Sequence, residues 1–181
     1  MLLLSEADIF GKGYHRTCYR HPNDASLCIK IMKKTQLKEL DREIEYYEIL
    51  AKKNISWDLL SKYHGQVETN EGLGEVFDLI LDSSGDVSKT FEHYLKEPHV
   101  EPTEELLNSL VELKSYMLKN AIVTTAIKPR NIVYQKSDSG NRAVIIDDIG
   151  NTEFIPLSTY YKVFARAKIK RKWKKFEKTY L

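Results

Sequence analysis

Long hydrophobic runs, cysteines and glycine-rich tracts are all scarce in this chain of 181 residues. The longest apolar stretches, such as residues 121–125 and 143–146, are far shorter than the roughly 20 residues that a membrane-spanning helix requires. The first residues lack the basic start and long apolar stretch of a secretion signal. We therefore expect a cytoplasmic protein.

The two cysteines, Cys18 and Cys28, lack the spacing of a metal site. We predict reduced thiols, although a hairpin that placed one opposite the other would allow a disulfide. None of the five histidines is spaced with a cysteine or carboxylate as a metal ligand or a base would be.

The net charge of +2 hides a strong asymmetry along the chain. Residues 158–181 contain nine Lys or Arg and one Glu, whereas the rest of the chain has 19 basic and 25 acidic residues. The body is therefore acidic, and its C-terminal segment is a basic arm.

The pattern of apolar residues and turn signals predicts two different halves. An apolar content of 42% and a charged content of 30% suit one soluble domain, or two small lobes that share a cleft. Before a linker at residues 82–86, we predict strands within residues 2–34, a helix over 36–53, and strands over 63–68 and 75–81. After the linker we predict helices over 88–96 and 103–119, short strands over 121–125, 132–135 and 143–147, and a helix through the basic arm. Together these predict a bilobal α+β protein.

Gly11 and Gly13 lie between two predicted strands. Two glycines there are more often a tight bend, but their backbone amides could also cover phosphate groups. The third glycine of a G-x-G-x-x-G pattern is replaced by Arg16, which could crowd a cleft or add a cation for phosphate.

Lys30 lies in the apolar strand Leu27–Met32. A lysine is costly to bury there unless it is paired, and the alternative is a residue on the exposed face of the strand. The best partner on the following helix is Glu43, because Tyr46, Tyr47 and Leu50 lie three, four and seven residues further on and would form the buried face.

Asn131, Asp147 and Asp148 come next to short predicted strands. Each could simply form a turn. Hard oxygen ligands at two adjacent strand ends are, however, what Mg²⁺ requires together with phosphate oxygens, and two successive carboxylates repel each other unless a cation is near. We favour a metal site.

In this order, these segments resemble the protein-kinase fold. Gly11-x-Gly13 resembles the glycine-rich loop, Lys30 the lysine of strand three, and Glu43 its ion-pair partner on helix C. The segment 124–131 is similar to the catalytic-loop pattern H-R-D-L-K-P-x-N, and the segment 148–150 to D-F-G.

The resemblance implies a five-stranded N-lobe over residues 1–82 with the hinge near 77–82, a short C-lobe over 83–157, and a basic helix over 158–181. It also implies ATP and Mg²⁺ as ligands. Gly11, Gly13, Lys30 and Glu43 would then be the nucleotide site, Lys128 a residue near the γ-phosphate, and Asn131 with Asp147 or Asp148 the metal ligands. A D-x-x-G reading would choose Asp147 over Asp148.

Several stretches resemble more narrowly the YrbL-type proteins, small bacterial kinase-like proteins of the PhoP regulatory network. They include residues 15–22, 28–31, 63–69, 122–124 and 149–150, in a match over about residues 1–175. This resemblance implies the fold more strongly than an activity.

The chain departs from the kinase pattern at the catalytic base. Ala126 stands where the catalytic Asp belongs, and Thr124 and Thr125 replace the preceding His and Arg. About 30 residues follow Gly150, without an A-P-E sequence, which is too short for the usual peptide-binding platform.

Three hypotheses follow for the function. The first is a nucleotide-binding pseudokinase, or a very weak phosphotransferase, that acts through a protein partner. The second is an atypical kinase of a small molecule or lipopolysaccharide, whose basic arm contacts an anionic inner membrane or a sugar phosphate. The apolar residues of the arm, Tyr161, Phe164, Ile169, Trp173 and Phe176, suit an interfacial helix, although packing of this stripe on the domain is the commoner case. The third, a nucleic-acid binder that uses the arm, is disfavoured by the acidic body.

Overall fold

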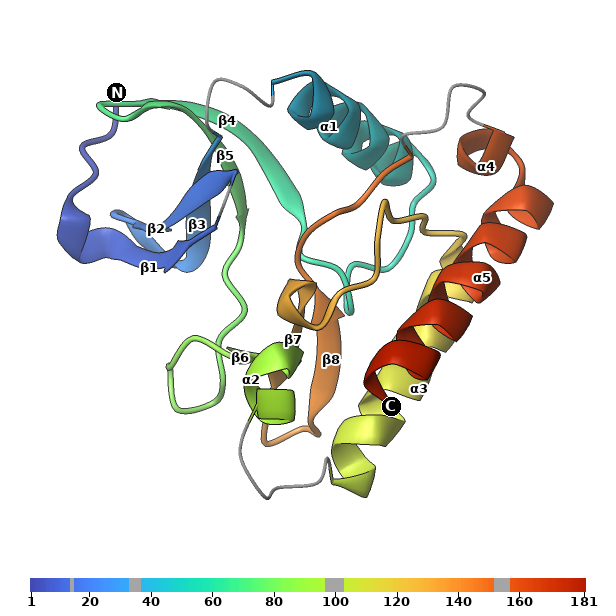
Figure 1. Ribbon diagram of the computed structural model, residues 1–181. Helices are drawn as coiled ribbons and strands as arrows, with labels where there is room; N and C mark the ends of the chain where they lie inside the picture. The colour runs from blue at the N-terminus through green and yellow to red at the C-terminus, as the bar shows by residue number, and fades with distance from the viewer. Residues whose placement is uncertain (14, 33–36, 97–102, 152–156) are drawn as a thin grey trace.

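The computed structural model describes residues 1–13, 15–32, 37–96, 103–151 and 157–181. Its first half is an antiparallel sheet of five strands in the order β1-β2-β3-β5-β4, with α1 (Leu37–Lys52) beside it (Figure 1). The strands are β1 (Ile9–Lys12), β2 (Arg16–His21), β3 (Asp24–Met32), β4 (Tyr63–Thr69) and β5 (Gly72–Asp78). This confirms the five-stranded sheet and the helix that were predicted for the first half.

The second half, over its described residues, combines a small sheet with helices. Its antiparallel strands, in the order β6-β7-β8, are β6 (Lys89–Thr90), β7 (Ile132–Gln135) and β8 (Arg142–Ile145). The helices are α2 (Phe91–Lys96), α3 (Glu104–Asn120), α4 (Leu157–Tyr160) and α5 (Lys162–Tyr180). Two 3₁₀ turns, η1 (Glu6–Asp8) and η3 (Pro129–Asn131), complete the described elements.

Two segments lack the strands expected in their regions. Residues 2–5, at the start of the predicted strand region 2–34, make only an isolated bridge between Leu2 and Thr69. The Asn70 side chain bonds both the N–H (2.7 Å) and the C=O (2.9 Å) of Leu4. Residues 121–125 make only the bridge between Thr124 and Ile149. Ala121 ends α3 in the left-handed conformation, so the chain turns there before a strand can form.

Two predicted helices differ in their first turns. Residues 89 and 90 of the expected helix over 88–96 form β6, since they pair with Tyr134 and Val133 of β7. The helix of the basic arm is divided into α4 and α5 at Tyr161, which has an extended backbone. The pairing of β6 with β7 and the extended backbone at Tyr161 cause these differences, and the spacing of apolar residues indicates neither.

A hydrophobic core shared by the two halves connects the two sheets. Its buried residues include Cys28 and Phe77 from the first sheet and Ile132 and Ile145 from the second. Backbone hydrogen bonds join the halves as well, because Ser61 N donates to Ile145 O at 3.0 Å. The walls of any cleft between the sheets are therefore held at a fixed distance by close packing.

Helix α1 is anchored to the second half by a buried tyrosine. The Tyr46 hydroxyl accepts a hydrogen bond from Val123 N at 2.9 Å and donates one to Ala121 O at 3.3 Å. The face that bears Glu43 and Tyr46 is buried, as predicted, whereas Glu45 and Glu48 are exposed. The sequence thus identified the face of α1 that meets the rest of the molecule.

The two cysteines are free thiols. Cys18 lies opposite Lys30 in the β2–β3 pairing and Cys28 lies opposite Arg20, so the two are not opposed. None of the described helices is both long and apolar enough to cross a membrane.

Candidate functional site

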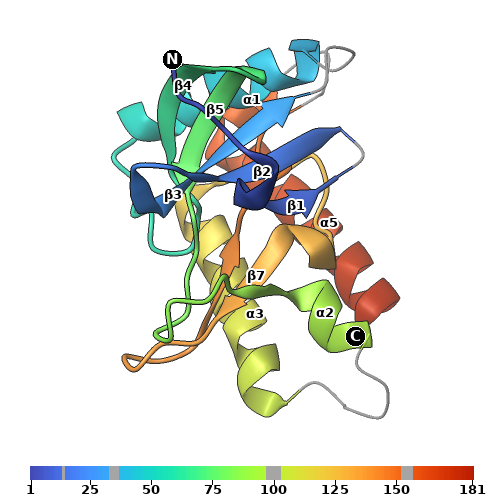
Figure 2. The same ribbon diagram turned by 90° about the vertical axis from the view of Figure 1, so that its left-hand side faces the viewer.

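A cleft of about 1110 Å³ is lined by residues of the β1–β2 hairpin and of the loops that flank β7 and β8. Figure 2 shows the β1–β2 hairpin above β7. The lining of the cleft includes seven of the residues predicted from the sequence: Gly11, Gly13, Glu43, Lys128, Asn131, Asp147 and Asp148. The turn η3 delivers Asn131, and the end of β8 delivers the two aspartates. Because Ile132 of β7 pairs with Ile145 of β8, the amide and the carboxylates come to the same end of this sheet.

Asp148 is the carboxylate that meets the predicted second-half residues. Its Oδ2 accepts hydrogen bonds from Lys128 Nζ at 2.8 Å and from Asn131 Nδ2 at 2.7 Å. Its backbone is left-handed, with φ of 60°, and Thr125 N donates to its carbonyl at 2.7 Å. A left-handed aspartate is uncommon and persists only when its surroundings hold it, as these contacts do.

Asp147 faces the first sheet instead. Its Oδ1 lies 3.0 Å from Arg16 Nη1, and the same guanidinium contacts Glu43 Oε2 through Nη2, also at 3.0 Å. Asp147 Oδ1 further accepts the Asp148 N–H at 2.8 Å. Arg16 thus joins β2, α1 and the end of β8 in one charged network.

The predicted ion pair between Lys30 and Glu43 is not formed, and this part of the sequence interpretation is corrected. The Lys30 ammonium donates to Ile146 O at 2.6 Å and lies 4.1 Å from the centre of the Phe77 ring. Lys30 is 6% exposed and is not among the residues that line the cleft. Arg16 takes the place of Lys30 as the partner of Glu43: its guanidinium donates a hydrogen bond to Glu43 Oε2 through Nη2 and lies within ion-pair distance of Asp147 through Nη1. A planar guanidinium suits two carboxylates better than a compact ammonium does.

The network shifts the pKa values of its two acids in opposite directions. Burial raises the pKa of Glu43 to about 7, against the lowering effect of the Arg16 charge. Burial also acts to raise the pKa of Asp147, but the charges of Lys30 and Arg16 outweigh it, so the pKa of Asp147 is lowered. Glu43 Oε1 is buried without a hydrogen-bond partner, which is consistent with a carboxyl that holds its proton more readily than usual.

Glu43 should make the stability of the fold depend on pH near neutrality. Its folded pKa of about 7 exceeds its ordinary value of 4.5, so the folded state binds the proton more tightly. Its contribution to stability is fully present below pH 4.5 and is lost as the pH rises through 7. We expect the melting temperature of the wild type to fall across this range more steeply than that of Glu43→Gln, and parallel curves would contradict the assignment.

Two lysines of α5 contact the loops of the site, and sequence reasoning missed both. Lys172 Nζ donates to the Thr125 carbonyl, and Lys168 Nζ donates to Asn151 Oδ1 at 2.5 Å. The two lysines are four residues apart on the helix, and Lys168 is buried, so they extend the packed face of α5. The available sequence signal was a pair of lysines in register with an apolar stripe, which the basic composition of the arm concealed.

Ala126 lies next to these contacts, within the loop between Thr125 and Lys128. Its methyl group can neither accept a proton nor orient a hydroxyl. The residue at the position of the base in the kinase pattern therefore cannot act as a general base.

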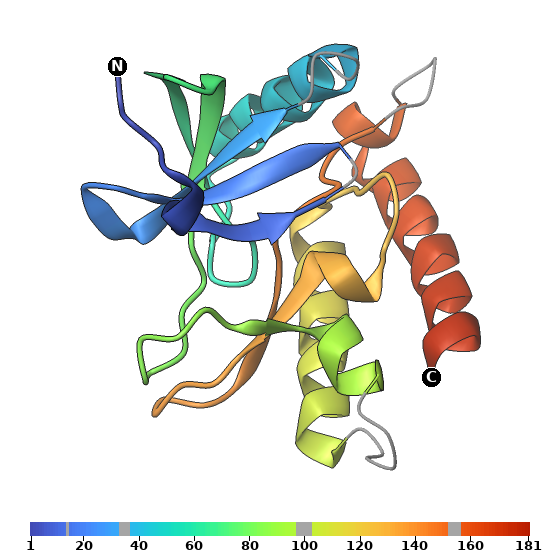
Figure 3. The ribbon, with the colours of Figure 1, turned by 60° about the vertical axis from the view of Figure 1, so that its left-hand side comes forward.

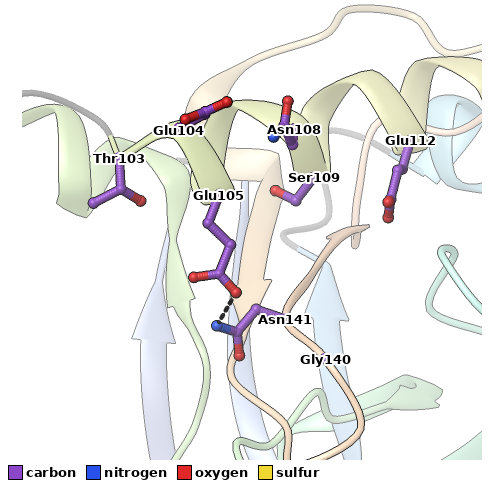
Figure 4. A pocket seen from close by; sticks show the side chains of 8 residues that line it. All are labelled: Thr103, Glu104, Glu105, Asn108, Ser109, Glu112, Gly140 and Asn141. Atoms are coloured by element: carbon purple, nitrogen blue, oxygen red, sulfur yellow. Dashed lines mark hydrogen bonds between the residues drawn. The ribbon is translucent and has the colours of Figure 1, made fainter.

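Within the described ranges, no three His, Cys, Asp or Glu side chains are grouped so that they could hold a metal ion. A second hollow, of about 650 Å³, lies at the first turns of α3, where Asn141 Nδ2 donates to Glu105 Oε1 at 2.7 Å (Figure 4). None of the residues predicted from the sequence lines it.

Comparison with known proteins shows the family of the chain. The model of the family "PhoP regulatory network protein YrbL" matches residues 2–181. The chain belongs to the YrbL family. The YrbL proteins of Escherichia coli K12 and Shigella flexneri are each 39% identical to it over 181 residues, covering 97% of this chain and 86% of theirs.

Solved structures of protein-kinase domains share the fold. The Mycobacterium tuberculosis PknI kinase domain matches with a TM-score of 0.56 at 16% identity, over 77% of this chain. A single-residue mutant of the same kinase domain matches with a TM-score of 0.55 at the same identity and coverage. The chain spans 57% of the length of either kinase domain, and the likeness shows a kinase-like fold.

Proposed function

We propose that this YrbL-family chain binds a nucleoside triphosphate with Mg²⁺ in the cleft and acts as a pseudokinase that signals through a protein partner. One observation carries the proposal. The Asp148 carboxylate, shortly after the end of β8, is held by Lys128 and Asn131. These two residues belong to the loop before β7, in which Ala126 stands at the position of the base. Several charged parts of a nucleotide site line the cleft, although Lys30 does not, and the proton acceptor is absent.

The residues of the cleft suit the ligands that the fold implies. Asp148 and Asn131 supply the hard oxygens that Mg²⁺ prefers, since rotation of the Asn131 amide presents its oxygen in place of the nitrogen. The side chains of Arg16 and Lys128 offer positive charge to phosphates, and the glycines of the β1–β2 turn bring backbone close to the same space. The metal, when bound, would neutralise phosphate charge.

Loss of the base does not by itself abolish phosphoryl transfer. The transition state is loose, so positioning and charge neutralisation supply most of the catalysis. A general base typically contributes about 10²–10⁴-fold. A chain with Mg²⁺ and Lys128 but without a base would therefore turn over very slowly.

Calorimetric titration with ATP, with and without Mg²⁺, tests the binding step. We expect binding of ATP that depends on Mg²⁺. The affinity should fall by about tenfold or more in Asp148→Asn, because this change removes one negative charge from the metal site. Asp138→Asn, a matched change in an exposed turn, should bind as the wild type does. Absence of binding at millimolar ATP would refute the proposal.

A second candidate is a kinase of a small anionic molecule, and the lining of the cleft favours it. Four more basic residues line the cleft: Lys12, Arg42, Lys89 and Arg130. They exceed what the triphosphate needs and could hold a sugar phosphate. Transfer of label from ATP into envelope extracts, abolished when Asp147 and Asp148 are both changed to Ala, would support this candidate, and label that never moves would exclude it.

A further inference from the structure

The outer side of α5 carries a continuous row of cations. The helix lies at one side of the molecule and packs on α3 (Figures 1 and 3). Its inner side is buried through Ala165, Ile169, Trp173 and Phe176. At 3.6 residues per turn, the exposed Lys170, Lys174 and Lys178 lie on the opposite side. The exposed Arg166 and Lys175 lie on its two flanks, and Arg166 Nε donates to Leu118 O of α3 at 3.1 Å. The one acidic residue of the helix, Glu177, is paired with Lys114 at 2.6 Å.

Exposed apolar side chains lie at the N-terminal end of this cationic face. Val163 is 75% exposed and Phe164 is 50% exposed, both within the first turn of α5. Leu157, Tyr160 and Tyr161, in α4 and at the junction of the two helices, are exposed as well. Single exposed apolar residues are ordinary, but five gathered beside a basic helix face mark an interaction surface.

We infer that this face, formed by α4 and the outer side of α5, binds the surface of an anionic lipid bilayer. Each lysine near such a surface adds electrostatic attraction, and aromatic or aliphatic side chains beside them enter the interfacial region. A bare cationic row would suit nucleic acid equally well. The aliphatic side chains of Leu157 and Val163 distinguish the two, because they can enter the interfacial region of a bilayer, whereas nucleic acid recruits aromatic side chains that stack on its bases.

Co-sedimentation of the full chain with vesicles tests this inference. We expect binding to vesicles of phosphatidylglycerol and phosphatidylcholine and none to phosphatidylcholine alone. Lys170→Glu with Lys174→Glu should lower the affinity by at least about tenfold, and Val163→Ser with Phe164→Ser by about fivefold or more. Lys62→Glu with Lys136→Glu, which changes the net charge equally at exposed sites outside α4 and α5, should bind as the wild type does. All of these side chains are exposed, so melting temperatures should stay within a few degrees.

Three results would overturn the inference. The first is no binding to anionic vesicles at low salt. The second is equal loss in both charge-reversed variants, which would reflect net charge alone. The third is a pair of results: the chain binds an RNA oligonucleotide and loses this binding in Lys170→Glu with Lys174→Glu, while Val163→Ser with Phe164→Ser leaves vesicle binding unchanged. These results would assign the face to nucleic acid. None of these experiments involves ATP, so they stand or fall separately from the proposed function.

Discussion

Changing Arg16 to Ala is expected to lower the free energy of unfolding by about 3 kcal/mol at pH 8, the loss typical of a buried charge left without its partner. Arg16 Nη1 and Nη2 each lie 3.0 Å from a carboxylate, and the side chains of Arg16 and Glu43 are only 16% and 7% exposed. Without the guanidinium, Glu43 and Asp147 would face each other in a partly dry space. Urea denaturation measures the loss directly.

The dependence on pH identifies the cause of this loss. At pH 5 Glu43, with a pKa of about 7, is protonated and carries no charge. Removal of Arg16 then leaves only the Asp147 carboxylate without a partner, so the decrease in the free energy of unfolding should be smaller than at pH 8. Arg16→Ala combined with Glu43→Gln should recover part of the stability at pH 8 for the same reason. The matched control is Arg20→Ala, an exposed arginine of the same strand, which should change stability by less than about 0.5 kcal/mol. A loss that is equal at both pH values would show that packing, rather than charge, is responsible.

The Arg16 network also shows why the site could be predicted only in part. Asn131 and Asp148 flank two strands that are close in sequence, and one hairpin pairing is enough to bring them together. A local pattern can therefore predict their meeting. The partner of Glu43 depends instead on which of two cations, Lys30 or Arg16, reaches its carboxylate. The direction in which each side chain points from the assembled sheet decides this, and the local sequence does not record it.

The same distinction applies to the fold. The stripe of apolar residues on α1 and the pattern of the strands β2 to β5 come from local periodicity, and these elements are found close to where they were predicted. The division between α4 and α5, and the contacts of Lys168 and Lys172, depend on partners far away in the sequence. The segment is basic in composition, and the apolar residues within it nevertheless place one side of α5 in the core.

Changing Ala126 to Asp is expected to raise the rate of phosphoryl transfer or ATP hydrolysis by about 10²–10⁴-fold, the usual contribution of a positioned general base. The backbone at this point is already held, because Thr125 N donates to Asp148 O at 2.7 Å and the Thr125 carbonyl accepts from Lys172. A carboxylate at 126 would therefore start from a fixed backbone, two residues before Lys128. Phosphate release and autophosphorylation with labelled ATP are the measurements.

Two variants make the result of Ala126→Asp specific. Ala126→Asn has nearly the same shape but cannot accept the proton, so it should stay near the wild-type rate. Ala126→Asp combined with Asp148→Asn should lose the gain, because the new base would act on a poorly held nucleotide. If ATP binds to Ala126→Asp but its turnover stays at the wild-type rate, the missing base is not what limits the chain. The limit would then lie in how the short second half positions an acceptor, since proximity and orientation can outweigh proton transfer in this chemistry.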